Sequence, residues 1–173
     1  MSAGGSPFQQ ALEALVRAGV DFVVVGVGGI NFYARDASEI VRTIDLDLLL
    51  SRRVEALARA LSALASEGFR FEAGGEPFVD STDDIVLERV VAAGSNVVAT
   101  REGASIDLMC SLAGFTFGEL AADAEPFRLG AVEISVGKLE KLLRSKELAG
   151  RAKDREFLRL FAARLRDAAE RED

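Results

Sequence analysis

The chain contains no histidine and only one cysteine among its 173 residues. Without histidine there is no imidazole for the usual zinc sites, or for Ser-His-Asp and Cys-His nucleophilic catalysis. The single thiol, Cys110, has no partner for an internal disulfide and fits a small apolar core residue better than a nucleophile. Any catalysis must therefore use carboxylates, Lys, Arg, Tyr or a metal ion held by oxygen ligands.

Long apolar runs and an excess of positive charge are also missing. No stretch approaches the roughly 20 apolar residues that cross a bilayer, and residues 1–6 lack the basic and apolar parts of a signal peptide. We therefore expect a cytoplasmic protein with no membrane partner. The net charge of −7 argues against broad sequence-independent binding of nucleic acid, because backbone phosphates attract a basic surface. It leaves room for one local basic groove.

The apolar content is sufficient for one ordinary folded domain. The chain is 49% hydrophobic and 28% charged, which is typical of a folded protein and not of a disordered one. We find no internal repeat and no low-complexity linker. The sequence therefore predicts a single domain over residues 1–173, with a flexible tail at residues 1–6.

Hydrophobic periodicity predicts helices that alternate with strands. Helical spacing indicates helices that begin at Pro7, Ile30 and Arg53, and two more at the end of the chain, over residues 138–149 and 152–170. Short apolar runs indicate strands, and residues 84–93 fit either a strand or a helix. The alternation predicts an α/β (α+β) fold. The expected strands cover residues 20–25, 40–50, 69–71 and 104–109, with a hairpin over residues 129–136.

Three aspartates in apolar strands are the first candidate site. Asp45 and Asp47 are two residues apart, so on a strand they share one face about 6.5–7 Å apart. Like charges this close raise each other's pKa unless a cation lies between them, and oxygen ligands alone favour Mg²⁺ or Mn²⁺. A solvated acidic face is the alternative. Residues 48–50 weaken that alternative because they continue the strand as if it were internal. Asp107, set in a second apolar strand, is the third candidate.

A glycine-rich segment and a cationic segment are candidate anion sites. Gly26, Gly28 and Gly29 form an expected turn after a buried strand, where a backbone can approach a phosphate and the next helix can direct N–H groups at it. The segment is neither a Rossmann fingerprint nor a P-loop, and an ordinary tight turn is the alternative.

Residues 138–155 hold seven Lys and Arg side chains. Those nearest Gly150 are placed to bind a triphosphate, although interleaved acids also allow solvated pairing.

These motifs together resemble a known superfamily. Gly28-Gly29, fifteen further residues and then Asp45-Leu46-Asp47, with a third Asp on a later strand, resembles the DNA polymerase beta-like nucleotidyltransferases. Lys146 followed by Arg151-Ala152-Lys153-Asp154 is similar to a signature of its minimal bacterial group, which includes the abortive-infection and toxin–antitoxin nucleotidyltransferases. The resemblance covers roughly residues 20–50 and 104–160.

The resemblance implies a mixed sheet flanked by helices and the transfer of a nucleoside monophosphate from an NTP to a hydroxyl. Asp45 and Asp47 would hold two Mg²⁺ (or Mn²⁺) ions, and Asp107 would share one ion and act as, or position, the general base. The C-terminal helices, residues 138–170, would flank this site. The implied nucleotide-binding residues are Gly28, Gly29, Arg42, Thr43, Lys146, Arg151 and Lys153.

Three functions remain as hypotheses at this point. The first, which the complete carboxylate set favours, is an active metal-dependent nucleotidyltransferase. The second is a non-catalytic regulatory module of the same fold, such as one half of a toxin–antitoxin pair, because the glycine segment departs from the Gly-Ser of many members. The third is an enzyme that modifies a small molecule, which the acidic surface favours. The acceptor (tRNA, protein or small molecule), the choice of NTP and a cognate antitoxin or toxin partner stay open.

Overall fold

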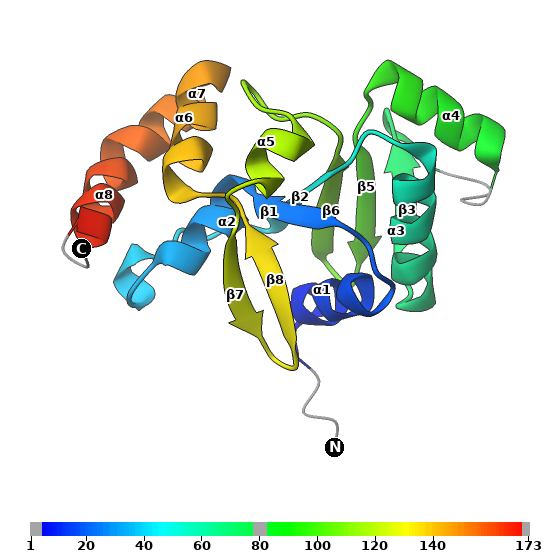
Figure 1. Cartoon of the computed structure of the whole chain (residues 1–173), viewed down its shortest axis with the longest axis horizontal. Coiled ribbons are helices and arrows are strands. Elements are labelled where there is room, and N and C mark those ends of the chain that lie inside the picture. Colours follow the sequence, from blue (N-terminus) through cyan, green and yellow to red (C-terminus); the bar gives the residue numbers. More distant parts are fainter. Residues whose placement is uncertain (1–4, 78–82, 171–173) are drawn as a thin grey trace.

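The computed structural model describes residues 5–77 and 83–170. These residues form one eight-stranded mixed sheet with helices packed on it, in the strand order β4-β3-β5-β6-β2-β1-β8-β7 (Figure 1). The predicted α/β (α+β) class, with a mixed sheet flanked by helices, is confirmed. The predicted tail, residues 1–6, falls mostly outside the described residues, and its last residue, Ser6, caps the first helix.

The elements follow one another along the chain as strands with intervening helices. The strands are β1 (Phe22–Val25), β2 (Asp45–Leu50), β3 (Arg70–Ala73), β4 (Glu76–Pro77), β5 (Val97–Arg101), β6 (Ala104–Met109), β7 (Glu125–Leu129) and β8 (Val132–Val136). The helices are α1 (Pro7–Arg17), α2 (Gly26–Ile30), α3 (Val54–Ser66), α4 (Asp84–Ala93), α5 (Phe117–Ala121), α6 (Leu139–Ala149), α7 (Ala152–Phe157) and α8 (Ala163–Glu170). Two 3₁₀ turns, η1 (Asn31–Tyr33) and η2 (Ala37–Glu39), and a π-helical turn, η3 (Leu158–Ala162), complete the described chain.

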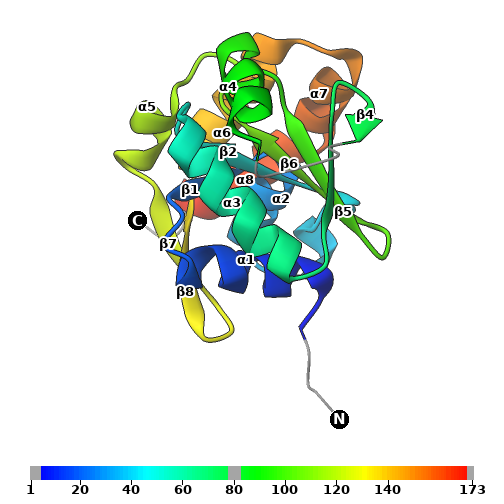
Figure 2. The same cartoon turned by 90° about the vertical axis from the view of Figure 1, so that its right-hand side faces the viewer.

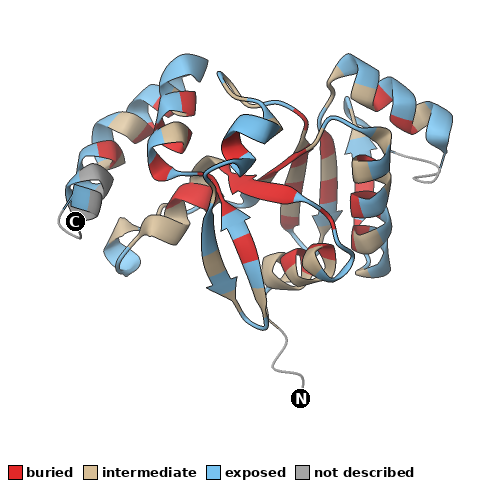
Figure 3. Cartoon of the chain, viewed as in Figure 1, coloured by how far each residue is buried: buried red, intermediate tan, exposed pale blue. Residues whose placement is uncertain are grey.

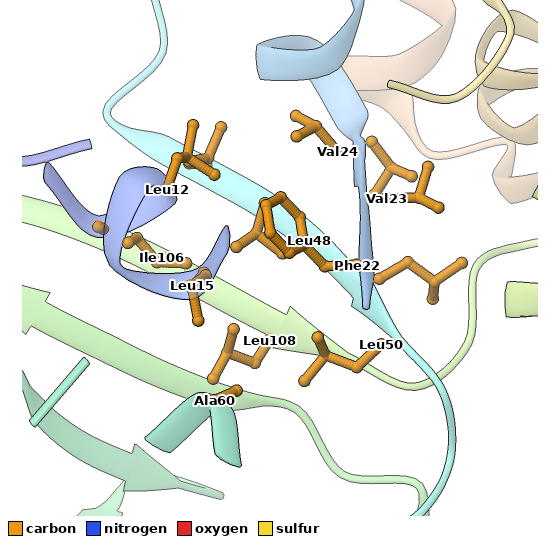
Figure 4. Close-up of a cluster of buried hydrophobic side chains, with 14 of the residues drawn as sticks. Leu12, Leu15, Phe22, Val23, Val24, Leu48, Leu50, Ala60, Ile106 and Leu108 are labelled. Atoms are coloured by element: carbon orange, nitrogen blue, oxygen red, sulfur yellow. The ribbon is translucent and has the colours of Figure 1, made fainter. Parts of the chain in front are cut away.

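Helices α1 and α3 lie side by side against one face of the sheet (Figure 2). Helix α1 begins where the Ser6 hydroxyl accepts a hydrogen bond from Gln9 N (3.2 Å), and Pro7 occupies its first turn. Its buried side is apolar, as is that of α3, and both contact the central strands (Figure 4). Figure 3 shows how burial concentrates in those strands. The core there includes Leu12, Leu15, Phe22, Leu48, Leu50, Ala60, Ile106 and Leu108.

The alternation of β2 and β6 explains why acidic residues occur in buried strands. Leu48, Ile106 and Leu108 point into the core beside α1 and α3, and Leu46 is buried against α2. Because successive side chains on a strand point to opposite faces, the residues between them point to the other face. Burying one face of each strand therefore fixes the direction of the carboxylates of Asp45, Asp47 and Asp107.

Two predictions around the glycine segment are wrong. Residues 26–29 do not form a turn before a helix at Ile30, because helix α2 begins at Gly26, which turns the chain at a φ of +65°. The strand expected from residue 40 begins only at Asp45. The Asn31 side chain explains that delay: it donates to Val41 O (2.8 Å) and accepts from Val41 N (2.9 Å). Both backbone groups that a strand would pair at Val41 are thereby occupied.

In the middle and at the end of the chain, the structure shows elements that the sequence left open or did not predict. Residues 84–93 are a helix, because the Asp83 carboxylate accepts from the N–H groups of Ile85 and Val86 and caps it. Strand β5 and helix α5 were not predicted. Helix α6 ends at Ala149, as expected, and Gly150 after it lies in the left-handed region. The last predicted helix contains the π-helical turn η3. None of the described helices is long and apolar enough to span a bilayer.

Candidate functional site

The pairing of β2 with β6 brings the three predicted carboxylates together. The two strands are parallel, and their register places Asp47 directly beside Asp107 and Asp45 beside Ser105. Asp45 is exposed, whereas Asp47 and Asp107 are partly buried. All three carboxylates line one cavity of about 570 Å³. The structure therefore assembles one acidic surface from residues that are 62 positions apart in the sequence (Asp45 and Asp107).

The electrostatics of the carboxylate pair are unfavourable without a cation. Burial raises the pKa of Asp47 to about 6, and the charges of Asp107 and Asp45 add to the increase, while Lys146 opposes it. Burial and the charge of Asp45 also raise the pKa of Asp107, against a hydrogen bond with Asp47 and the charge of Lys153. A hydrogen bond between the two carboxyl groups raises the pKa of Asp47 and lowers that of Asp107. Because two adjacent half-buried carboxylates do not ionise freely, the pair binds a proton more readily than an ordinary carboxylate does.

The donor set at this pair fits a hard divalent cation. Among the described residues no group of three His, Cys, Asp or Glu side chains is close enough to hold a metal by itself. Mg²⁺ does not require such a group, because it is usually held by one or two carboxylates, waters and substrate phosphates. A cation between Asp47 and Asp107 would relieve the repulsion between the two carboxylates. Mn²⁺ fits the same oxygen donors.

A buried carboxylate holds two of the predicted cations at the cavity wall. Asp154, at 1% exposure of its side chain, lies 3.4 Å from Lys146 Nζ and 2.6 Å from Arg151 Nε. Arg151 also donates through a second nitrogen (3.2 Å), which makes its contact two-pronged. Burial alone would raise the pKa of Asp154, but the hydrogen bonds from Arg151 and the charge of Lys146 lower it below its usual value. Asp154 is therefore an ionised anchor that joins the start of α7 to α6.

Lys146 is the cation most closely coupled to the acidic surface. Its side chain is 12% exposed, and burial lowers its pKa although the charges of Asp154 and Asp47 favour the ammonium form. Lys153 is exposed and lines the same cavity, where its charge lowers the pKa of Asp107. One face of the cavity thus carries carboxylates, and α6 and α7 supply ammonium groups to it.

The remaining predicted residues divide between the cavity and its surroundings. Thr43 lines the cavity, and its hydroxyl donates to Asp45 O (2.9 Å) and accepts from Asp45 N (3.2 Å), which fixes the start of β2. Arg42 is exposed and borders a separate shallow depression with Thr43 and Ile44. Gly28 and Gly29 do not line the cavity. A Cβ at Gly28 would lie 2.9 Å from Leu46 Cδ1, and one at Gly29 would lie 2.9 Å from Val24 O, so both glycines serve the packing of α2.

Sequence reasoning did not include Gly26 or Asp154 among the site residues, although it placed Gly26 in the expected turn and Asp154 in the signature that follows Lys146. A Cβ at Gly26 would overlap the Asp47 carboxylate, so the absence of a side chain there keeps space around that group. The sequence shows only that this glycine directly follows a buried strand, and the pairing of that strand with β2 is a finding of the structure. The sequence could have indicated Asp154 by its position three residues after Arg151, because that spacing suits an ion pair on a helix.

No family model matches the chain, and no curated protein matches it.

The raised pKa of Asp47 predicts an unusual dependence of stability on pH. The carboxyl has a pKa near 3.8 when unfolded and about 6 when folded, so the folded state binds a proton first as the pH falls. Without divalent metal, the wild type should therefore gain free energy of unfolding between pH 7.5 and pH 4.5, relative to Asp47→Asn. At pH 7.5 the variant should be more stable by about 1–3 kcal/mol.

Urea unfolding at several pH values, in the presence of a chelator, measures this difference. Glu72→Gln, which removes an exposed strand carboxylate outside the cavity, is the control and should parallel the wild type. A constant difference between Asp47→Asn and wild type across the pH range would contradict the raised pKa.

Proposed function

We propose that the chain is a metal-dependent nucleotidyltransferase that moves a nucleoside monophosphate from an NTP to a hydroxyl acceptor. The observation that carries the proposal is the side-by-side register of Asp47 and Asp107 on parallel strands, with Asp45 on the same face of a cavity that also contains Lys146 and Lys153. Carboxylates and ammonium groups that line one cavity support a metal–polyphosphate ligand better than either kind of group alone.

The charged residues of the cavity have different roles in the proposed reaction. Asp45, Asp47 and Asp107 would hold Mg²⁺ or Mn²⁺, which would supply charge neutralisation at the phosphates. Lys146 and Lys153 would bind the polyphosphate oxygens, and Asp154 would keep Lys146 in place for that role. Arg151 serves mainly to anchor Asp154, because both of its short contacts go to that carboxylate.

In this mechanism Asp107 is the base that accepts the proton of the acceptor hydroxyl. The acceptor oxygen forms a bond to the α-phosphorus while the bond from that phosphorus to the bridging oxygen breaks, and pyrophosphate leaves. The hydroxyl proton passes to the Asp107 carboxylate. Asp107 is suited to that role by its position, because it faces the cavity and lies directly beside Asp47 on the neighbouring strand. Thr43 contributes indirectly by fixing the backbone of Asp45.

Calorimetry of nucleotide binding tests the proposal without knowledge of the acceptor. We expect the wild type to bind an NTP in the presence of Mg²⁺, with a dissociation constant on the order of 1 µM to 1 mM. Binding should be lost when a chelator replaces Mg²⁺, and it should weaken strongly in Asp47→Asn. The Glu72→Gln control should bind as the wild type does.

Binding that ignores both Mg²⁺ and Asp47 would contradict a metal-dependent site. The absence of any binding to the wild type would instead favour a non-catalytic regulatory module of the same fold. A cognate protein partner would then be the ligand to seek.

A further inference from the structure

The cavity that holds the charged residues also has an apolar wall that the proposed chemistry does not use. Phe157, Leu160 and Phe161, from α7 and the π-helical turn η3, line it together with the carboxylates. The Phe157 and Phe161 rings lie 5.4 Å apart between centroids, at an interplanar angle of 34°. Leu160 is 45% exposed, although it is a large apolar side chain. These three side chains are called the apolar wall below.

Lys146 connects the apolar wall to the charged part of the cavity. Its ammonium nitrogen lies 4.9 Å from the centroid of the Phe157 ring and 3.4 Å from Asp154 Oδ1. The same ammonium group acts electrostatically on Asp47. The apolar wall therefore begins at the cation proposed to bind phosphate, within one cavity, and does not form a separate hydrophobic patch.

The π-helical turn contributes directly to this arrangement. Turns of this kind are rare and occur mostly as single turns inside α-helices, often at functional sites. Here the turn spans Leu158–Ala162 and so carries two of the three residues of the apolar wall. Core packing accounts for Ala162, which is buried, but not for Leu160, whose side chain is nearly half exposed on the cavity side.

We propose that the apolar wall binds the base of the nucleotide, an inference that rests on the proposed function. A ligand that satisfies the whole cavity must join a polyanion at Lys146 to a planar apolar group at Phe161 and Leu160. A nucleoside triphosphate has that combination, and a free polyphosphate does not. Stacking on an aromatic side chain is available to every base, because each has a π-face. The apolar wall thus selects nucleotides over other polyphosphates.

Comparison of two ligands on the wild-type chain separates this inference from the proposed function. Calorimetry with Mg²⁺ measures the affinity for an NTP and for inorganic tripolyphosphate, which has the chain of three phosphates but neither ribose nor base. We expect the NTP to bind roughly 5- to 100-fold more tightly. Equal affinities would overturn the inference and leave the proposed function standing. Failure of both ligands to bind would overturn the proposed function itself.

Variants of the apolar wall then assign the difference to named residues. Leu160→Ala and Phe161→Leu should each weaken NTP binding several-fold and leave tripolyphosphate binding unchanged. Leu158→Ala is the matched control, because Leu158 lies in the same turn but does not line the cavity. Circular dichroism confirms that each variant is folded.

Two outcomes would overturn the assignment. One is an equal loss of NTP affinity in Leu158→Ala and Leu160→Ala, which would reduce the apolar wall to a structural role. The other is unchanged NTP affinity in Leu160→Ala and Phe161→Leu with a lower transfer rate, which would assign the apolar wall to the acceptor.

Discussion

Replacing Asp45 and Asp47 together by asparagine should lower the Mg²⁺-dependent transfer of label from an α-³²P-labelled NTP by about 100-fold or more. The two side chains share the face of β2 that lines the cavity, and Asp47 is paired in register with Asp107. Asparagine keeps the size of each side chain but removes the charge that would hold a cation. The loss should therefore be one of chemistry, with the fold retained.

The assay follows label from the NTP into RNA, protein and small molecules of a cell extract, resolved separately. Glu72→Gln on β3 is the matched control, since it neutralises an exposed strand carboxylate outside the cavity. Urea unfolding of the double variant under the assay conditions shows whether it is folded. Labelling by the double variant at the wild-type rate would contradict a catalytic role for these carboxylates.

Replacing Asp154 by asparagine should reduce the free energy of unfolding by about 3 kcal/mol. The change leaves Lys146, whose side chain is 12% exposed, next to a neutral group in a place where water reaches it poorly. The contact with Arg151 contributes less, because that guanidinium is 59% exposed and regains water readily. Thermal or urea denaturation measures the loss, and NTP binding should weaken as Lys146 loses its anchor.

Glu156→Gln is the control for this prediction. Glu156 lies two residues further along α7 and pairs with Arg159, but both side chains are more than half exposed. Removal of its charge should leave the free energy of unfolding nearly unchanged. Similar losses of unfolding free energy in Asp154→Asn and Glu156→Gln would contradict the claim that burial makes the Asp154 ion pair important for stability.

Local patterns were enough to predict the carboxylates and most elements that carry them. Apolar residues on one side of Asp45, Asp47 and Asp107 set the direction of each acid, since strand alternation depends only on neighbours in the sequence. The pairing of Asp47 with Asp107 is different. It depends on which of the eight strands lies beside β2, and that is decided by packing between distant segments.

The glycine segment shows how a local pattern can mislead. Three glycines after a strand are typical of a turn, but tertiary contacts hold them in helix α2. Gly29 is close to Val24 O and Leu142, so its lack of a side chain serves helix packing. The glycine next to a carboxylate of the site is Gly26, and only the position of β2 beside β1 reveals this.

The C-terminal cations were predicted as residues but not as an arrangement. Their number suggested a phosphate site, whereas the structure engages both Arg151 and Lys146 with Asp154. Lys146 and Lys153 also lower the pKa values of the site carboxylates. The π-helical turn has no signature in the helical spacing of residues 152–170. Its contribution of Leu160 and Phe161 to the cavity became visible only in three dimensions.

A crystal structure with Mg²⁺ and a nonhydrolysable NTP is the most direct test of the central claim, that the three aspartates form a metal–nucleotide site. We expect metal density in contact with Asp47 and Asp107, and a triphosphate between that metal and Lys146. Nucleotide bound away from these aspartates, or bound at them with no metal present, would contradict the claim.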